Sequence, residues 1–327
     1  MKKIIQTIAL LVCSFCPPMA ATNPAAQQLL VAAKQQASLF HNEGGPFQLD
    51  IDFVVQMHVP AQGHMTLKWG GKDRWWRKIV MQGFEQVEIR NGDRLYTSRN
   101  VGFTPLHIKE LISLVEFAES SEPFAVKKQK QHVENGVEIT YLQVSRKDVH
   151  AKPHEVCLNR ASHEILSDEW SDVPDGRRRQ EYSDYLDFTG RHYPRELRLV
   201  ENGRVIISAN IQNVAATTFD DGLLLPPTRA IERRQCDGMK YPKAVKTPEP
   251  EYPRSNRENR LMGDTAVAMT VMADGSVDNI QLIGRSTPDM DNATLQTLKG
   301  WKFKPAMCGS EPVVSDIEVV VSFRSYN

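Results

Sequence analysis

The sequence lacks an excess of charge of either sign, since 40 Lys and Arg residues stand against 40 Asp and Glu. Nucleic-acid binding depends on a basic surface, so this balance argues against a DNA- or RNA-binding protein. Cysteine is also scarce, because five in 327 residues are too few for a disulfide-rich scaffold. Charged residues make up only 24% of a chain that is 41% hydrophobic, which excludes wholesale disorder. The length therefore predicts about two folded domains.

Motifs of the common enzyme classes are missing as well. The sequence has no G-x-S-x-G elbow, no Walker loop, no Rossmann glycine pattern and no HExxH motif. His154-Glu155 and His163-Glu164 begin like a zinc-protease motif, but neither has a second histidine four positions after the first. We therefore predict a protein that is not an enzyme and that carries no metal ion or cofactor.

The apolar run near the N-terminus is shorter than the roughly 20 residues that a membrane-spanning helix requires. This run, Ile4–Val12, follows two lysines and ends before Pro17, the layout of a secretory signal cleaved after Ala20 or Ala21. We therefore predict a signal peptide over residues 1–21 and export to the periplasm. An uncleaved anchor and a lipoprotein lipidated at Cys13 are the alternatives.

Apolar and polar residues alternate over long stretches of the first two thirds of the chain. From 47 to 59 every odd position is apolar, and every even position is polar except Val54, which is typical of a strand with one dry face. Asn-Gly pairs at 91–92, 135–136 and 202–203 predict two-residue hairpin turns. A helix is expected over 25–36, with Asn23 as its N-cap and Pro24 in its first turn. A second helix is expected after Thr104-Pro105, which is predicted to cap it. Residues 22–221 are therefore predicted to form an antiparallel meander with two helices.

Residues 25–215 resemble the LolA/LolB-like superfamily of periplasmic lipoprotein carriers. The likeness lies in the N-terminal helix, the long first strand, the segment Tyr193–Leu197 and the strands around Asn202-Gly203. It implies a curved, half-barrel-like sheet whose apolar face accommodates acyl chains or an apolar segment. From the residues alone, the same side chains fill a closed core equally well, so a hydrophobic ligand is one of two expectations.

Six prolines between Pro226 and Pro253 mark a change of organisation. Proline at this density disfavours regular structure, so we predict a linker at 222–245 and a second domain at 246–327. Alternation in the second domain predicts strands over 266–273, 277–282 and 313–323, with a helix over 289–299 before the last strand. The expected fold class of the whole chain is α+β, with a small C-terminal ββαβ domain.

These C-terminal residues resemble the C-terminal domain of the TonB family of energy transducers. The likeness covers about residues 245–327, and its motif positions are expected to be structural: Tyr252, Pro253, Gly263, Asp274, Gly275, Trp301, Phe303 and Pro305. Asp274-Gly275 predicts a hairpin turn, and Trp301 and Phe303 are expected between helix and sheet. Pro305 is expected to end any continuation of the helix.

The last predicted strand lies at the side of a three-stranded sheet, where an extended peptide can add as a further strand. In the TonB family such a strand binds the box peptide of outer-membrane transporters, so the resemblance implies a transporter or another envelope protein as the partner. The expected peptide-binding residues are Val314, Asp316, Glu318, Val320 and Ser322. Alternatively, the first domain covers this strand, or a second copy pairs with it in a homodimer.

The sequence departs from the energy-transducer pattern in lacking a long anchor and a long proline-rich spacer. We therefore predict a non-enzymatic, exported envelope protein that binds an extended peptide in transport across the envelope. The alternatives are a lipid or lipoprotein carrier docked by its C-terminal domain, and an anchored transducer with an uncleaved N-terminus. Cys157, Cys236 and Cys308 remain after signal removal. A Cys236–Cys308 bond would tether the linker to the loop before the last strand, but the sequence leaves the pairing open.

Overall fold

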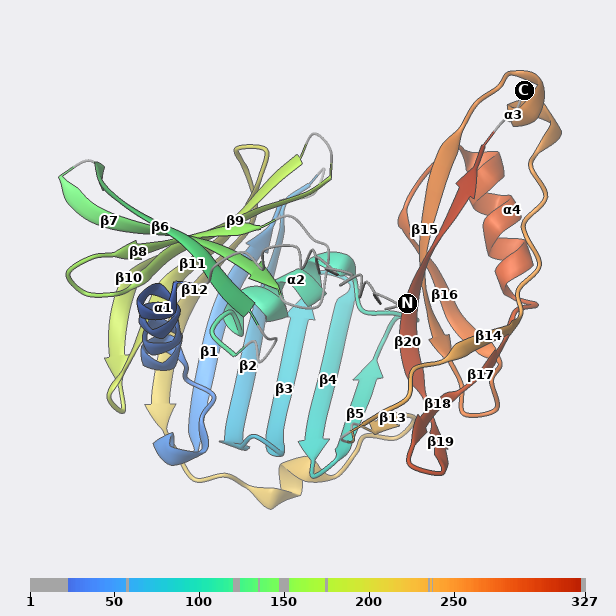
Figure 1. Ribbon diagram of the computed structural model, residues 1–327. Helices are drawn as coiled ribbons and strands as arrows, with labels where there is room; N and C mark the ends of the chain where they lie inside the picture. Colours follow the sequence, from blue (N-terminus) through green and yellow to red (C-terminus); the bar gives the residue numbers. More distant parts are fainter. Residues whose placement is uncertain are drawn as a thin grey trace, which may run out of the picture.

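The computed structural model describes residues 23–324 except 57, 58, 120–123, 135, 147–152, 174, 175, 235 and 237. Strands account for 56% of the structure, and a large curved antiparallel sheet stands beside a small C-terminal unit (Figure 1). The predicted fold class is therefore confirmed. The predictions of a signal peptide and of a lipidated Cys13 fall outside the described residues.

The large unit is one antiparallel sheet of thirteen strands. Their bounds are β1 (Phe47–Val55), β2 (Ala61–Gly71), β3 (Arg74–Met81), β4 (Phe84–Asn91), β5 (Arg94–Arg99), β6 (Phe124–Glu134), β7 (Val137–Arg146), β8 (His154–Asn159), β9 (Ile165–Val173), β10 (Gly176–Phe188), β11 (Arg191–Glu201), β12 (Arg204–Ala216) and β13 (Ile231–Arg234). Two meanders, β1–β5 and β6–β12, join where β1 pairs with β12. Because β13 and β6 form the two ends of the order, the sheet is open.

The alternation of apolar residues determines which face of the sheet is buried. In β1 the side chains of Phe47, Leu49, Ile51, Phe53 and Val55 are at most 2% exposed, whereas the residues between them are partly or fully exposed. The predicted first strand is confirmed, although it ends before residue 59.

Tight hairpin turns join successive strands. Between β11 and β12 both Asn202 (φ 50°) and Gly203 (φ 78°) have the positive φ that a two-residue hairpin turn requires. Gly92 (φ 62°) has it between β4 and β5. The predicted turn at Asn202-Gly203 is confirmed, whereas the β4–β5 hairpin turns at Gly92 and Asp93, one residue later than predicted, because Asn91 still pairs with Arg94. Strands β6 and β7 also pair, but Asn135 lies outside the described residues.

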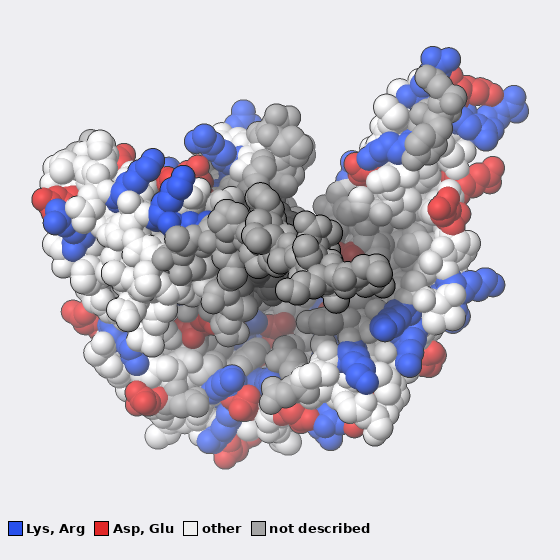
Figure 2. All heavy atoms as spheres, in the orientation of Figure 1, with Lys and Arg blue, Asp and Glu red and all other residues white. Residues whose placement is uncertain are grey.

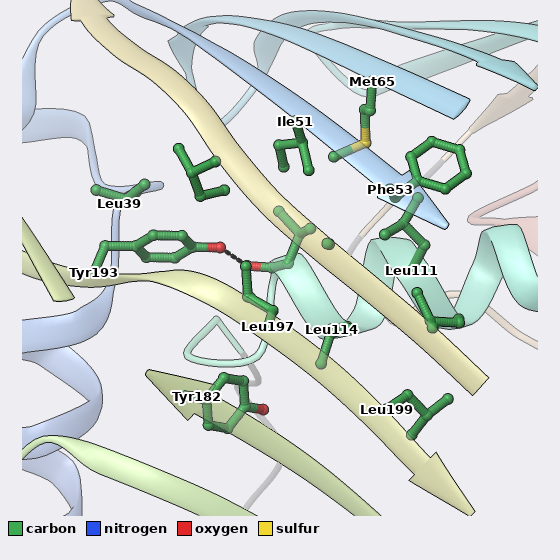
Figure 3. Close-up of a cluster of buried hydrophobic side chains, with 14 of the residues drawn as sticks. Leu39, Ile51, Phe53, Met65, Leu111, Leu114, Tyr182, Tyr193, Leu197 and Leu199 are labelled. Carbon is green, nitrogen blue, oxygen red and sulfur yellow. Dashed lines mark hydrogen bonds between the residues drawn. The ribbon is translucent and has the colours of Figure 1, made fainter. Parts of the chain in front are cut away.

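Helices α1 (Pro24–Ala37) and α2 (Leu106–Val115) supply side chains to the core on the apolar face of this sheet (Figure 1). Figure 3 shows Leu111 and Leu114 of α2 beside the sheet residues Phe53 and Leu197, and all four are almost fully buried. The Tyr193 hydroxyl donates a hydrogen bond to the main-chain carbonyl at the end of α2 (2.5 Å). The two predicted helices are thus present and tied to the sheet.

The start of α2 differs from the prediction. Thr104 does not cap the helix, because Pro105 occupies the N-cap position and no side chain caps the first turn. The Thr104 hydroxyl instead donates a hydrogen bond to the Gln86 side chain of β4. By contrast, the predicted cap of α1 is present, since the Asn23 side chain accepts a hydrogen bond from the N–H of Ala26 (3.1 Å).

The proline-rich segment contains regular elements. A short 3-10 helix, η2 (Asp221–Leu224), precedes β13, which pairs with β5 of the large sheet. Further along, β14 (Lys243–Lys246) pairs with β17 (Lys302–Lys304) of the C-terminal unit. The chain therefore passes from one unit to the other between β13 and β14, and the limits 222–245 stay a prediction.

The C-terminal unit packs a three-stranded sheet against one helix. The sheet order is β16 (Val277–Gly284), β15 (Gly263–Val271) and β20 (Ser315–Phe323), and α4 (Pro288–Leu298) lies against β15 and β16. The predicted sequence of two strands, a helix and a final strand is confirmed. Five short elements of this region were not predicted, namely β14 and β17, introduced above, and α3 (Arg254–Glu258), β18 (Ala306–Cys308) and β19 (Glu311–Val313).

Candidate functional site

Strand β20 forms one edge of the small sheet. It pairs with β15 along its whole length, from Ser315 to Phe323. Among the described residues, no backbone group hydrogen-bonds to its other side. The strand therefore offers a row of N–H and C=O groups to which another chain can pair.

The side chains of β20 alternate between two faces. Ile317, Val319 and Val321 are half-buried against the core beneath α4, whereas the residues between them are exposed. Among these exposed residues is the apolar Val320, with 65% of its surface exposed. The sequence predicted five peptide-binding residues: Val314, Asp316, Glu318, Val320 and Ser322. Val314 precedes the strand, and the other four share the outer face of the small sheet.

Two carboxylates of this outer face contact the large unit. Asp316 Oδ2 lies 3.0 Å from Nε of Arg233 in β13, and its Oδ1 accepts a hydrogen bond from the Thr270 hydroxyl (2.7 Å). Glu318 Oε1 lies 3.5 Å from Nζ of Lys109 in α2. Burial alone would raise the pKa of Asp316, but the charge and hydrogen bond of Arg233 outweigh it and hold the pKa below its ordinary value. The large unit therefore covers part of this face, while the backbone edge stays unpaired.

A covalent bond and a shared arginine hold the C-terminal unit beside the edge of the large sheet. Cys236, just after β13, forms a disulfide with Cys308 in β18, with 5.8 Å between the Cα atoms. Arg234 contacts both Asp93 of the large unit (2.6 Å) and Glu311 of the C-terminal unit. The two units are therefore linked at the point where the chain passes between them.

A pocket of about 250 Å³ is lined by residues of both units, whose upper parts are separated by a notch in Figure 2. Its lining includes Arg99, Phe103 and Lys109 from the large unit and Gln281, Asp316 and Glu318 from the small sheet. Sequence reasoning missed the large-unit residues, because they lie far from β20 in the chain and no local pattern marks them.

Arg99 is held in this pocket without a carboxylate partner. Its guanidinium donates hydrogen bonds to the Thr104 hydroxyl (3.2 Å) and the Gly102 carbonyl (3.1 Å). Within the part of the chain that the structure describes, it forms no ion pair. Burial, followed by the neighbouring positive charge of Arg233, lowers the pKa of Arg99. The pocket therefore contains a cation that the protein itself does not neutralise by direct contact.

The hairpin turn at Asp274-Gly275 contacts the segment after α4 that contains Trp301 and Phe303. Gly275 has φ 79°, and a Cβ atom there would lie 2.0 Å from the carbonyl oxygen of Phe303, so only glycine fits. The Phe303 N–H donates to the Gly275 carbonyl (2.9 Å), and Asp274 accepts from the N–H of Ser276 (2.8 Å). Trp301 packs on the small core, and its indole N–H donates to a main-chain carbonyl (3.0 Å).

The remaining motif residues also serve the fold. The Tyr252 ring lies 5.6 Å from that of Phe323, and Pro253 occupies the N-cap position of α3. Gly263 leaves room for Ser286, since a Cβ there would lie 1.9 Å from its Oγ. Pro305 separates β17 from β18, and because α4 already ends at Leu298 there is no continuation of the helix for it to end.

The apolar face of the large sheet is filled by protein side chains. Tyr193, Phe47, Leu49 and Ile51 are among its largest side chains and are less than 2% exposed. A separate pocket of about 730 Å³ is lined by residues of β1, β2, β3, β11 and β12, and many of these are polar. The hydrophobic ligand expected in this unit stays a prediction.

The residues that the structure describes lack two features. No helix there is both long and apolar enough to cross a membrane. No group of three or more His, Cys, Asp and Glu side chains there is placed to hold a metal ion.

The C-terminal unit is similar in sequence to known proteins. Residues 248–325 match the family model of the Gram-negative bacterial TonB protein C-terminal. These residues form a TonB-like C-terminal domain. The chain is 33% identical over 70 residues to protein TonB of Klebsiella aerogenes and 29% identical over 75 residues to that of Escherichia coli strain K12. These matches cover 21% and 23% of this chain and 29% and 31% of the relatives, so the chain spans less than a third of their length.

Solved structures resemble both units. The solution NMR structure of the Pseudomonas aeruginosa TonB CTD is 26% identical, with a TM-score of 0.24, and covers 28% of this chain and 98% of its own. The crystal structure of a LolA superfamily protein from Nitrosomonas europaea is 12% identical, with a TM-score of 0.45, and covers 63% of this chain and 98% of its own. Both resemblances expected from the sequence are therefore among the matches.

Proposed function

We propose that this protein acts in the periplasm in transport across the cell envelope, by binding an extended peptide segment of another envelope protein. The peptide adds as a fourth strand along the free edge of β20 in the TonB-like domain. The observation that carries this proposal is the unpaired edge of β20, which no described backbone group occupies. The partner is an outer-membrane transporter or another envelope protein with an exposed extended segment.

The edge has the length and the chemistry for such binding. Its nine residues extend over about 30 Å, at roughly 3.4 Å per residue. Main-chain hydrogen bonds supply affinity, and side chains of the peptide point alternately to the two faces. On one face they meet the half-buried Val319 and Val321, and on the other they meet Glu318 and Val320. A segment with apolar residues at every second position fits this surface.

Two neighbouring proline substitutions test the proposal. Successive N–H groups of a strand point to opposite sides. Of Val319→Pro and Val320→Pro, one variant therefore removes a hydrogen-bond donor to β15, and the other removes a donor at the free edge. The variant that loses the β15 bond should melt at a lower temperature. The other should keep its melting temperature and lose binding of fluorescent ten-residue peptides from outer-membrane transporters. Val320→Thr keeps the N–H group and serves as the matched control.

Two outcomes would contradict strand addition. One is unchanged peptide binding in the proline variant that still folds. The other is the absence of binding by the unaltered protein to every peptide in the set. Hydrogen exchange provides an independent measurement, because an added strand should slow exchange of alternate amides in β20 and leave those of β6, the opposite edge of the large sheet, unchanged.

A carrier of acyl chains is the second candidate, and one observation favours it. Of the four buried residues of α1, three are alanines, Ala26, Ala33 and Ala37, so little apolar area holds this helix on the sheet. Displacement of α1 would expose the apolar face to a ligand. Native mass spectrometry of protein purified without detergent should then detect bound acyl chains. A spectrum of unliganded protein alone would refute the carrier function and leave peptide binding untouched.

A further inference from the structure

The pocket between the two units adjoins the strand edge that is proposed to bind the peptide. Asp316, Ile317 and Glu318 belong both to β20 and to the pocket lining. An added strand lies about 4.8 Å from β20, and side chains directly opposite one another have Cβ atoms about 5 Å apart. An outward-pointing peptide side chain opposite Asp316 or Glu318 therefore stands within reach of the large unit.

The charges around the pocket are unequal. Asp316 pairs with Arg233, and Glu318 pairs with Lys109. Arg99 forms no ion pair with any carboxylate in the described part of the chain. Its guanidinium donates hydrogen bonds to a hydroxyl group and a main-chain carbonyl group. A half-buried guanidinium whose direct hydrogen-bond partners are neutral binds a carboxylate more strongly than it binds a neutral group, since charge-assisted hydrogen bonds are roughly twice as strong.

We infer that this pocket is a subsite for an acidic side chain of the bound peptide, with Arg99 as its main contact and Lys109 as a second. The inference rests on the proposed strand addition to β20 and names the class of partner. That partner is an extended segment with a glutamate or aspartate at the position opposite Asp316 or Glu318. The volume of about 250 Å³ admits a single side chain of this size rather than a second segment of chain.

The subsite assigns a role in specificity to the large unit. Arg99 ends β5, and Lys109 lies in α2, so neither belongs to the TonB-like domain. The disulfide between Cys236 and Cys308 keeps these residues next to β20. Backbone pairing would then bind extended peptides in general, and the large unit would select those with an acidic residue at one position.

A charge scan of the peptide tests this inference on the full chain. A labelled peptide that binds β20 is prepared with glutamate, glutamine or lysine at each outward-pointing position, and affinities are measured by fluorescence anisotropy. At one position the peptide with glutamate should bind about tenfold more tightly than the peptide with glutamine, and the peptide with lysine should bind more weakly than both. Arg99→Gln should abolish the preference for glutamate, and Lys109→Gln should reduce it.

Controls separate this subsite from general charge effects. Lys127→Gln removes one positive charge from exposed β6, at the opposite end of the large sheet, and should leave the preference intact. If glutamate and glutamine peptides bind equally well to the unaltered protein, the subsite is refuted while strand addition stands. If no peptide binds at all, the proposed function itself fails. The peptide scan needs no variant, so the inference stays testable even when Arg99→Gln does not fold.

Discussion

The ammonium group of Lys109 in α2 lies 3.5 Å from the carboxylate of Glu318 in β20, although the two residues belong to different units. Together with the Arg233–Asp316 pair, this contact places the outer face of the small sheet against the large unit. Lys109 and Glu318 are both exposed, so their pair contributes at most about 1 kcal/mol. The disulfide between Cys236 and Cys308 adds a covalent link between the units.

Reduction of the disulfide should weaken the C-terminal unit. The Cys236–Cys308 bond joins residues 72 positions apart, and loss of such a constraint typically costs about 2–4 kcal/mol. Guanidinium unfolding of the Cys236→Ser/Cys308→Ser variant should therefore show an earlier transition for the TonB-like domain. Cys157→Ser, which removes the half-buried free thiol, is the matched control. Equal midpoints for the double variant and the unaltered protein would contradict the expectation.

The buried Arg77 should be critical to the large unit. Its side chain is 8% exposed and lies 2.5 Å from Glu88 and 2.7 Å from Glu116. Burial alone would lower the pKa of Arg77, but the two carboxylates raise it above the usual value, so the residue stays charged. Arg77→Met should cost about 3–5 kcal/mol in the free energy of unfolding, because it leaves Glu88 buried without its partner.

An exposed pair between β3 and β4 provides the comparison for Arg77. Lys78 lies 2.9 Å from Glu85, and both side chains are well exposed. Lys78→Met should change the free energy of unfolding by less than about 1 kcal/mol. Urea titrations of the two variants measure the difference, and a similar loss in both would show that burial does not set the cost.

Gly275 should tolerate no side chain. Its φ of 79° disfavours other residues, and a Cβ atom would lie 2.0 Å from the carbonyl of Phe303. Gly309 has a similar φ of 62° but open space around it. Gly309→Ala should therefore cost about 1 kcal/mol through the backbone alone, and Gly275→Ala should cost several times more. Thermal melts of the two variants compare these losses, and equal shifts would argue against the clash.

His192 should make the large unit less stable as the pH rises. Its ring nitrogens each lie 2.7 Å from a carboxylate, that of Asp187 or of Glu164. Burial alone would lower the pKa of His192, but the two hydrogen bonds raise it above 6.5. Because the pKa of His192 is higher in the folded state, its protonated ring stabilises the fold fully below about pH 6.5. This stabilisation is lost as the pH rises through the folded pKa.

His192→Asn isolates this pH effect. The melting temperature of the unaltered protein should fall between pH 6 and pH 8, and the fall should be smaller in the variant. His132→Asn on exposed β6 is a suitable control, because this histidine forms no ion pair in the described part of the chain. An unchanged pH profile in His192→Asn would contradict the assignment.

The local parts of the fold followed from short sequence patterns. The alternation at Phe47 and its odd-numbered successors predicted β1, because side chains of a strand point alternately to two faces. Asn202-Gly203 predicted a hairpin, because its positive φ values suit few other residues. Thr104 was wrongly expected to cap α2, because the distant Gln86 accepts its hydroxyl hydrogen bond, and no local pattern reveals that partner.

Local residue patterns predicted the main helices and strands, the hairpins and the TonB-like order of the C-terminal domain, since each depends on neighbours along the chain. The pairing of β1 with β12, the return of β13 to β5 and the contact of the large unit with β20 became visible only in the folded chain. Arg99, Lys109 and Arg233 converge on one face although they lie in separate segments. Such contacts form through packing and charge between distant segments, and no residue pattern within one segment encodes them.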